Sequence, residues 1–211
     1  MPTITAISPQ KRRKNRSNIY LDGKFAFGLS DSVVAARGLG IGTELTDELR
    51  ADIEQGELRA EAFEAGTRLL SMRLQGESEL RTKLKRRDFP PAVIDAVVEE
   101  LRRLGYLNDA AFAEAKARDA AKARGHGSRR ALAELRKVGV DEKTAAAAVE
   151  KVYEEHDDVA VARDLAAKKL RTLTRFDDAT KKRRLYGMLA RRGFDSEICA
   201  TVIDEVLSGA S

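Results

Sequence analysis

The amino-acid sequence predicts a mostly α-helical protein, an elongated array of three tandem three-helix repeats with a small N-terminal β-hairpin extension. Three observations predict this fold class. Apolar residues alternate with polar ones before Asp31, they recur at helical spacing after it, and a helix-ending motif occurs three times. We therefore expect a hairpin or three-strand extension at 1–45, a linker helix with repeat 1 at 46–108, repeat 2 at 109–156 and repeat 3 at 157–211.

The N-terminal segment has the pattern of half-buried strands. Four of its apolar residues alternate with polar neighbours: Ile19, Leu21, Phe25 and Phe27. The pair Asp22-Gly23 between them favours the positive φ angles of a tight turn, so we predict a hairpin at 18–29 and a third strand at 3–8. After a glycine-rich loop, Thr46 has the side chain that caps a helix start and opens a long helical region.

A helix-ending motif recurs about every fifty residues. Its shared features are a leucine on the apolar stripe, two basic residues, a turn residue and a hydrophobe that packs back; the copies are Leu84–Phe89, Leu135–Val140 and Leu189–Phe194. The basic residues suit a last helical turn because the helix dipole favours cations there. We expect one helix before each copy (78–87, 128–138, 178–192), one after it (91–104, 142–155, 196–207) and a longer one earlier (61–74, 109–123, 159–173).

Capping residues support these boundaries. Ser78, Ser128, Asp141 and Ser196 each precede a helical run, and Pro91 stands where proline is tolerated at a helix start. A unit of about fifty residues is near the lower limit for burying a core alone, so we expect each repeat to stack against its neighbours.

The composition permits an anionic partner without requiring one. The 211 residues include 39 lysines and arginines against 34 aspartates and glutamates, a net charge of +5. The single cysteine, Cys199, lies at apolar spacing and is expected to be buried. His126 and His156 have no cysteine or carboxylate cluster at ligand spacing, so no metal and no cofactor is expected.

The sequence carries no sign of a membrane partner. The first ten residues lack the apolar core of a signal peptide, and no apolar run reaches the roughly 18 residues that cross a bilayer. We therefore expect a cytoplasmic protein.

Positive charge gathers on the middle helix of each repeat and in one N-terminal run. On the first middle helix, Leu80 and Leu84 are expected to face inward, which leaves Arg81 with Lys85 and Lys83 with Arg87 as outward-pointing like-charge pairs. Such pairs cost stability, which favours a phosphate-bearing or acidic partner over a merely solvated face. The candidate binding residues on these basic faces are Lys11, Arg12, Arg13, Lys14, Arg81, Lys83, Lys85, Arg86, Arg87, Arg129, Arg130, Arg136, Lys137, Lys181, Lys182, Arg183, Arg184, Arg191 and Arg192.

The N-terminal run admits two interpretations, a phosphate-binding loop or an exposed connection between strands. Aromatic residues make up only 5% of the chain and tryptophan is absent, so a platform for stacking bases is not evident. The positions expected to be exposed hold charged residues and few asparagines or glutamines, which argues against base-specific contacts.

No catalytic arrangement is evident in the sequence, so an enzyme is not expected. The chain lacks a phosphate-binding loop of the G-x-x-x-x-G-K-[ST] type, and the glycines from Gly38 to Gly42 are interpreted as a turn. Asp157-Asp158 and Asp177-Asp178 are interpreted as helix caps, with a metal-dependent nuclease as the alternative.

Four segments together resemble the RecX family. They are Arg68 to Arg73, Glu79 to Leu84, Gly105 to Asp109 and Phe112-Ala113. The resemblance covers residues 60–207 through the triple repeat, and the N-terminal hairpin with Ile19 to Gly23 is similar to an extension that many members carry. Asn108 stands where the family commonly has aspartate, and either side chain can cap a helix.

The resemblance implies a regulator that lies in the groove of a RecA filament on single-stranded DNA, inhibits recombinase and ATPase activity, and modulates recombinational repair and the SOS response. It implies RecA and single-stranded DNA as partners of the basic faces, with double-stranded DNA as an alternative. We expect the protein itself to be a monomer. The competing hypothesis is a general or transcriptional DNA-binding protein, which three helix-turn-helix-like units would also suit.

Overall fold

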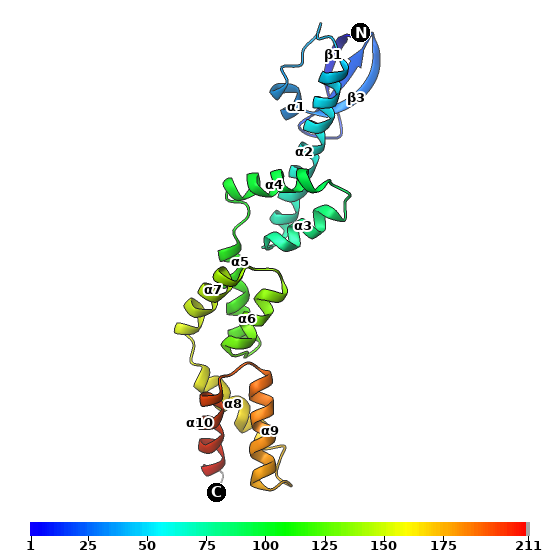
Figure 1. Ribbon diagram of the computed structural model, residues 1–211. Coiled ribbons are helices and arrows are strands. Elements are labelled where there is room, and N and C mark those ends of the chain that lie inside the picture. The colour runs from blue at the N-terminus through cyan, green and yellow to red at the C-terminus, as the bar shows by residue number, and fades with distance from the viewer. Residues whose placement is uncertain (210–211) are drawn as a thin grey trace. The chain divides into compact units, whose positions relative to one another are not determined.

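The computed structural model describes residues 1–209, which form two compact units (Figure 1). The first unit comprises residues 1–73 and 80–107, and the second comprises residues 74–79 and the chain from Asn108 onward. Within the described residues, no helix is both long enough and apolar enough to cross a membrane.

The first unit begins with a three-stranded antiparallel sheet in the order β1-β2-β3, formed by Ile4–Pro9, Arg16–Leu21 and Lys24–Ser30. The predicted hairpin and third strand are confirmed. Asp22 and Gly23 make the turn with φ angles of 48° and 80°. One face of the sheet buries Ile4, Ile19 and Leu29 against the short helix α1 (Asp31–Ala36) and the start of α2.

Helix α2 (Asp47–Met72) is a single helix of 26 residues. Thr46 caps it as predicted, because its side chain accepts a hydrogen bond from the Leu49 amide. Its first half contributes Ile53 to the core under the sheet, and its second half contributes Ala62 to the core of repeat 1. The sequence predicted the opening of this helix and its last turns, and the structure joins them without a break.

The three repeats each have three helices and a core of their own, which confirms the predicted fold class. Repeat 1 combines the end of α2 with α3 and α4, at Glu77–Lys85 and Pro91–Arg103. Repeat 2 has α5 with its π-helical continuation η1, then α6 and α7, at Asp109–Arg118, Asp119–Ala123, Ser128–Lys137 and Glu142–Glu154. Repeat 3 has α8, α9 and α10, at Asp158–Leu170, Asp178–Arg191 and Ser196–Ser208.

The predicted caps are confirmed in part. Asp141 accepts a hydrogen bond from the Thr144 amide at 3.0 Å, and Asn108 accepts one from the Ala111 amide. The expectation for Ser78, Ser128 and Ser196 is wrong, because each lies inside the first turn of its helix. The N-cap residues of α6 and α10 are Gly127 and Asp195, and neither has a side-chain capping bond.

The aspartate pairs and the cysteine lie as expected. Asp157 and Asp177 cap α8 and α9 by accepting hydrogen bonds from the Ala160 and Thr180 amides. Cys199 is fully buried in the core of repeat 3.

The three helix-ending motifs adopt the same turn. Their leucines are buried, and their turn residues Asp88, Gly139 and Gly193 have left-handed φ angles of 62°, 83° and 88°. A Cβ atom on Gly139 would lie 2.4 Å from the Ser78 hydroxyl oxygen, and one on Gly193 would lie 2.4 Å from the Arg130 amide nitrogen. Only glycine fits these two turns, whereas aspartate is accommodated at the first turn, which no three-helix repeat precedes.

Candidate interaction surfaces

The basic turn of repeat 1 keeps its charge uncompensated. Leu80 and Leu84 of α3 are fully buried, as predicted. Lys85, Arg86 and Arg87 are exposed and form no ion pair with any described residue. We define these three residues as the repeat 1 turn cluster.

The other two basic residues of this helix lie differently. Arg81 forms an ion pair with Asp95 of α4 at 2.5 Å, and Lys83 is half-buried. The expected pairing of Lys83 with Arg87 along the helix is wrong, because α3 ends at Lys85 and Arg87 lies in the following turn.

Most of the basic residues of α6 are neutralised by carboxylates. Arg136 donates to the Glu142 carboxylate through both Nε and Nη2, and this contact lowers the pKa of Glu142 and raises the pKa of Arg136. Arg129 forms an ion pair with Asp195 of repeat 3. Lys137 alone among the predicted residues of this helix is exposed without an ion pair to a described residue.

The basic residues of α9 divide in the same way. Lys181 and Lys182 form ion pairs with Asp178 and Asp204, each at 2.8 Å. Arg184 stacks over the Phe176 ring at 3.9 Å. Two further residues are exposed and have no ion pair with the described part of the chain: Arg183 and Arg191.

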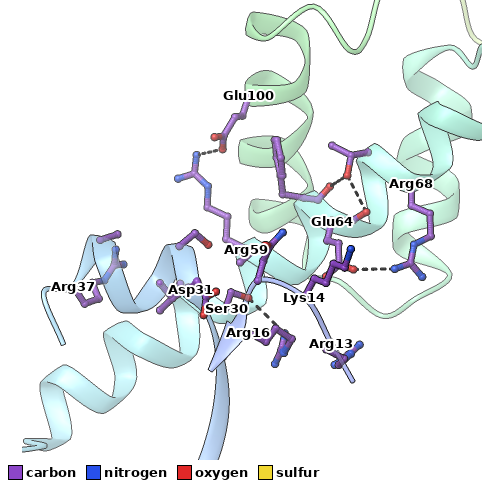
Figure 2. Close-up of a pocket in the computed structure, with 18 of the residues that line it drawn as sticks. Arg13, Lys14, Arg16, Ser30, Asp31, Arg37, Arg59, Glu64, Arg68 and Glu100 are labelled. Atoms are coloured by element: carbon purple, nitrogen blue, oxygen red, sulfur yellow. Dashed lines mark hydrogen bonds and ion pairs between the residues drawn. The ribbon is translucent and has the colours of Figure 1, made fainter. Parts of the chain in front are cut away.

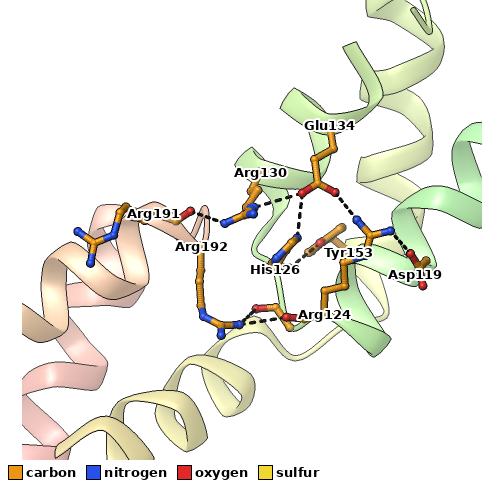
Figure 3. A network of polar contacts seen from close by, with 9 residues as sticks. Asp119, Arg124, His126, Arg130, Glu134, Tyr153, Arg191 and Arg192 are labelled. Carbon is orange, nitrogen blue, oxygen red and sulfur yellow. Dashed lines mark hydrogen bonds and ion pairs between the residues drawn. The ribbon is translucent and has the colours of Figure 1, made fainter. Parts of the chain in front are cut away.

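Two of the predicted residues, Arg130 and Arg192, join repeat 2 to repeat 3 (Figure 3). Arg192 donates from Nη1 to the Arg124 carbonyl oxygen at 3.0 Å, and Arg130 donates from Nη1 to the Arg191 carbonyl oxygen at 3.1 Å. The Gly127 amide also donates to the Arg192 carbonyl oxygen at 2.8 Å. Both guanidinium groups therefore have structural partners, which sequence reasoning did not foresee.

His126 lies at the centre of this joint and is only 8% exposed. Its Nδ1 atom is 3.2 Å from a Glu134 carboxylate oxygen, while its carbonyl oxygen accepts a hydrogen bond of 2.6 Å from the Tyr153 hydroxyl. Burial, followed by the positive charge of Arg130, lowers the pKa of His126, so the imidazole is neutral at pH 7. Burial also raises the pKa of Tyr153.

The predicted basic run of residues 11–14 forms the loop between β1 and β2, and it lies over helix α2 (Figure 2). Together with α1 they line an open cleft of about 1080 Å³, which we call the basic cleft. Its lining includes Arg12, Arg13 and Lys14 from the loop and Arg59 and Arg68 from α2.

Sequence reasoning missed the contribution of α2 to this cleft. Arg59 pairs with Glu100 at 2.7 Å and Arg68 pairs with Glu64 at 2.8 Å, so in sequence they resemble ordinary solvated helix residues. Their position beside the loop depends on how the sheet packs on α2, for which the sequence has no local signal.

The described residues hold no group of three or more histidine, cysteine, aspartate or glutamate side chains that could bind a metal ion. The two aspartate pairs considered for a nuclease serve as helix caps through Asp157 and Asp177.

Models of four family domains match the chain. They are the "Regulatory protein RecX N-terminal domain" over residues 2–46 and the first, second and third RecX three-helix domains over residues 62–101, 108–149 and 155–203. The matched segments follow the sheet and the three repeats.

Proteins similar to the chain carry the same name. The chain is 31% identical to "Regulatory protein RecX" of Bacillus subtilis over 98% of its own length and 78% of that protein. It is 38% identical to the protein of that name from Bacillus velezensis, over 68% of its own length and 55% of that protein. A solved structure described as "Crystal structure of regulatory protein RecX" is similar with a TM-score of 0.89 and 29% identity, covering 97% of this chain and all of that one.

Proposed function

The chain belongs to the RecX family of regulatory proteins, and on this premise we propose that it binds the RecA filament on single-stranded DNA and inhibits recombinase and ATPase activity. In this proposal the protein acts in the cytoplasm as a monomer, modulates recombinational DNA repair and the SOS response, and catalyses no reaction itself. Beyond the family, the repeat 1 turn cluster is the observation that carries the proposal.

The charge of this cluster supports an anionic partner. Lys85, Arg86 and Arg87 are adjacent, exposed and unpaired among the described residues, although acidic side chains are plentiful in the chain. Further exposed cations, without an ion pair to any residue that the structure describes, lie on the middle helices of repeats 2 and 3, at Lys137, Arg183 and Arg191. A filament, which presents the same acidic or phosphate groups at regular intervals, suits cations that recur with each repeat.

The proposal is tested by the ATPase activity of RecA filaments assembled on single-stranded DNA before the protein is added. We expect the ATPase rate to fall as the protein is titrated. An unchanged rate at a several-fold excess over RecA would overturn the proposal. Adding the protein after assembly also separates a filament regulator from a general DNA-binding protein, which would compete for DNA mainly before RecA has covered it.

A variant locates the contact. The triple change K85Q/R86Q/R87Q removes the charge of the repeat 1 turn cluster, and we expect it to raise the concentration needed for half-inhibition by roughly tenfold, about 1.4 kcal/mol. The matched control K24Q/R50Q/R103Q removes three other exposed charges of the same unit, none of which has an ion pair with a described residue, and it should leave inhibition unchanged. Equal inhibition by both variants would place the contact elsewhere.

A further inference from the structure

We propose that the basic cleft binds the phosphodiester backbone of a nucleic acid, without regard to base sequence and without RecA. The inference rests on the function proposed above, since it assigns to the N-terminal unit a direct contact with the DNA of the filament. It also gives a role to the loop of residues 11–14, for which the sequence left two interpretations open.

The first argument is the balance of charge in the cleft. Its lining holds seven basic and three acidic side chains. Four of the basic residues have carboxylate partners, because Arg16, Arg37, Arg59 and Arg68 pair with Glu57, Asp52, Glu100 and Glu64. The remaining three, Arg12, Arg13 and Lys14, have no ion pair with a described residue and are exposed.

The third acidic residue of the lining, Asp31, forms no ion pair with these three residues, and its single charge offsets at most one of theirs. Asp31 accepts a hydrogen bond of 2.8 Å from the Ser17 hydroxyl, at the edge of the sheet. The cleft therefore has an excess of positive charge at its loop side, and Figure 2 shows Arg13 and Lys14 on that side. Such a concentration of like charge in a concave site attracts an anion more strongly than the same charges on a convex surface.

The second argument is that the loop backbone is held in place. Strands β1 and β2 pair as far as Pro9 and Ser17, and the Gln10 amide donates to the Arg16 carbonyl oxygen at 2.8 Å. At the other end of the loop, the Asn15 carbonyl oxygen accepts a hydrogen bond of 2.9 Å from the Asp31 amide. Binding would therefore order side chains rather than the loop backbone, which lowers the entropy cost of binding.

The third argument favours a nucleic-acid backbone over an acidic protein surface. The apolar part of the lining consists of Val33, Ala36, Ala60 and the half-buried Phe63. Protein interfaces usually depend on several large apolar or aromatic anchors, and Phe63, itself half-buried, is the only large apolar side chain among the described lining residues. Arginine and lysine alone are sufficient for phosphate groups, and without a fully exposed aromatic residue for stacking we expect the contact not to distinguish bases.

The test is direct binding of the full chain, without RecA or nucleotide, to a fluorescently labelled oligothymidine, followed by anisotropy at several salt concentrations. We expect R12Q/R13Q/K14Q to weaken binding by roughly tenfold or more at low salt and to reduce the slope of log K against log salt by about 2. The control K24Q/R50Q/R103Q carries the same change in net charge outside the cleft and should change the affinity less than about twofold.

Several outcomes would overturn the proposal. The first is that the unchanged protein does not bind the oligonucleotide, and the second is that the cleft variant binds it with unchanged affinity and salt slope. The third is that the cleft variant binds DNA normally but binds RecA more weakly, which would assign the cleft to a protein surface. A parallel measurement with double-stranded DNA identifies the source of the phosphodiester groups. If the cleft variant loses affinity for both single-stranded and double-stranded DNA, the result supports a contact with the backbone that both forms share. The substituted side chains are exposed, and an unchanged circular dichroism spectrum confirms that the variant is folded.

The outcomes also separate this proposal from the proposed function. If the protein inhibits RecA but the cleft variant binds DNA normally, the cleft proposal fails and the proposed function remains. If the cleft variant loses DNA binding while the unchanged protein never inhibits RecA, the proposed function fails and the cleft remains a nucleic-acid site.

Discussion

Replacement of Gly193 by alanine tests whether close backbone approach sets the joint between repeats 2 and 3. Its φ angle of 88° is costly for alanine, by roughly 1–2 kcal/mol. The new Cβ would also lie 2.4 Å from the Arg130 amide nitrogen, so the start of α6 must shift. Overpacking of this kind costs about 1–3 kcal/mol, which gives an expected loss of about 2–5 kcal/mol for Gly193→Ala.

Gly125→Ala is the matched control within the same unit. Its φ angle of 59° carries a similar backbone cost, but the nearest atom to its new Cβ would be 3.5 Å away, an ordinary contact. The gain from a less flexible unfolded chain applies to both variants and cancels in the comparison. We therefore expect Gly193→Ala to be less stable than Gly125→Ala by about 1–3 kcal/mol.

The assay is urea unfolding monitored by circular dichroism, with the free energies of unfolding of the two variants compared at equal m-values. A difference below about 0.5 kcal/mol would refute the reasoning. It would mean that the joint accommodates a side chain at position 193 without loss of stability. The hydrogen bond from the Gly127 amide to the Arg192 carbonyl oxygen would then not require the observed close approach of the two backbones.

Three further predictions concern the second unit. Gly139→Ala should destabilise it by about 2–4 kcal/mol, and Ser78→Gly in the same chain should restore part of that loss, because the clash is with the Ser78 side chain; additive losses in the double variant would contradict this. Because the pKa of His126 is lowered on folding, the unfolded chain takes up its proton first and stability falls as pH drops below about 6.5. His126→Gln should flatten the decline in urea midpoint between about pH 7.5 and 5.5, and a parallel decline would exclude this residue as its source. Asp157→Ala should lower the free energy of unfolding by about 1 kcal/mol through loss of the α8 cap, with Asp157→Asn nearly neutral, as urea titration would measure.

Features with a local cause could be predicted from the sequence. The hairpin follows from Asp22-Gly23, where the turn chemistry and the alternating pattern agree. The helix-ending turns follow from a buried leucine, a dipole-compatible basic pair and a residue that tolerates positive φ. These features depend on neighbours within a few residues, so the sequence pattern contains their cause.

Features that depend on distant neighbours could not be predicted. The cap of α6 falls on Gly127 instead of Ser128, at a position where the backbone of Gly193, far along the chain, leaves no room for a Cβ. The π-helical turn Asp119–Ala123 brings Arg124 to the joint. No residue type in that alanine-rich segment predicts a π-helical turn. In sequence, Arg130 and Arg192 look the same as the exposed Arg183, and only the packed joint separates a structural guanidinium from an available one.

The joints themselves explain where available charge remains. Of the two basic residues beside Gly193, Arg192 bonds to repeat 2 by its side chain, whereas Arg191 contributes only its carbonyl oxygen and keeps its side chain exposed. The corresponding turn of repeat 1 has no three-helix repeat before it, so its cations have no preceding repeat to bond to. For the same reason, the Asp88 side chain is accommodated at this turn. The first unit thus keeps both the repeat 1 turn cluster and the basic cleft, and we expect it to supply most of the electrostatic attraction to an anionic ligand.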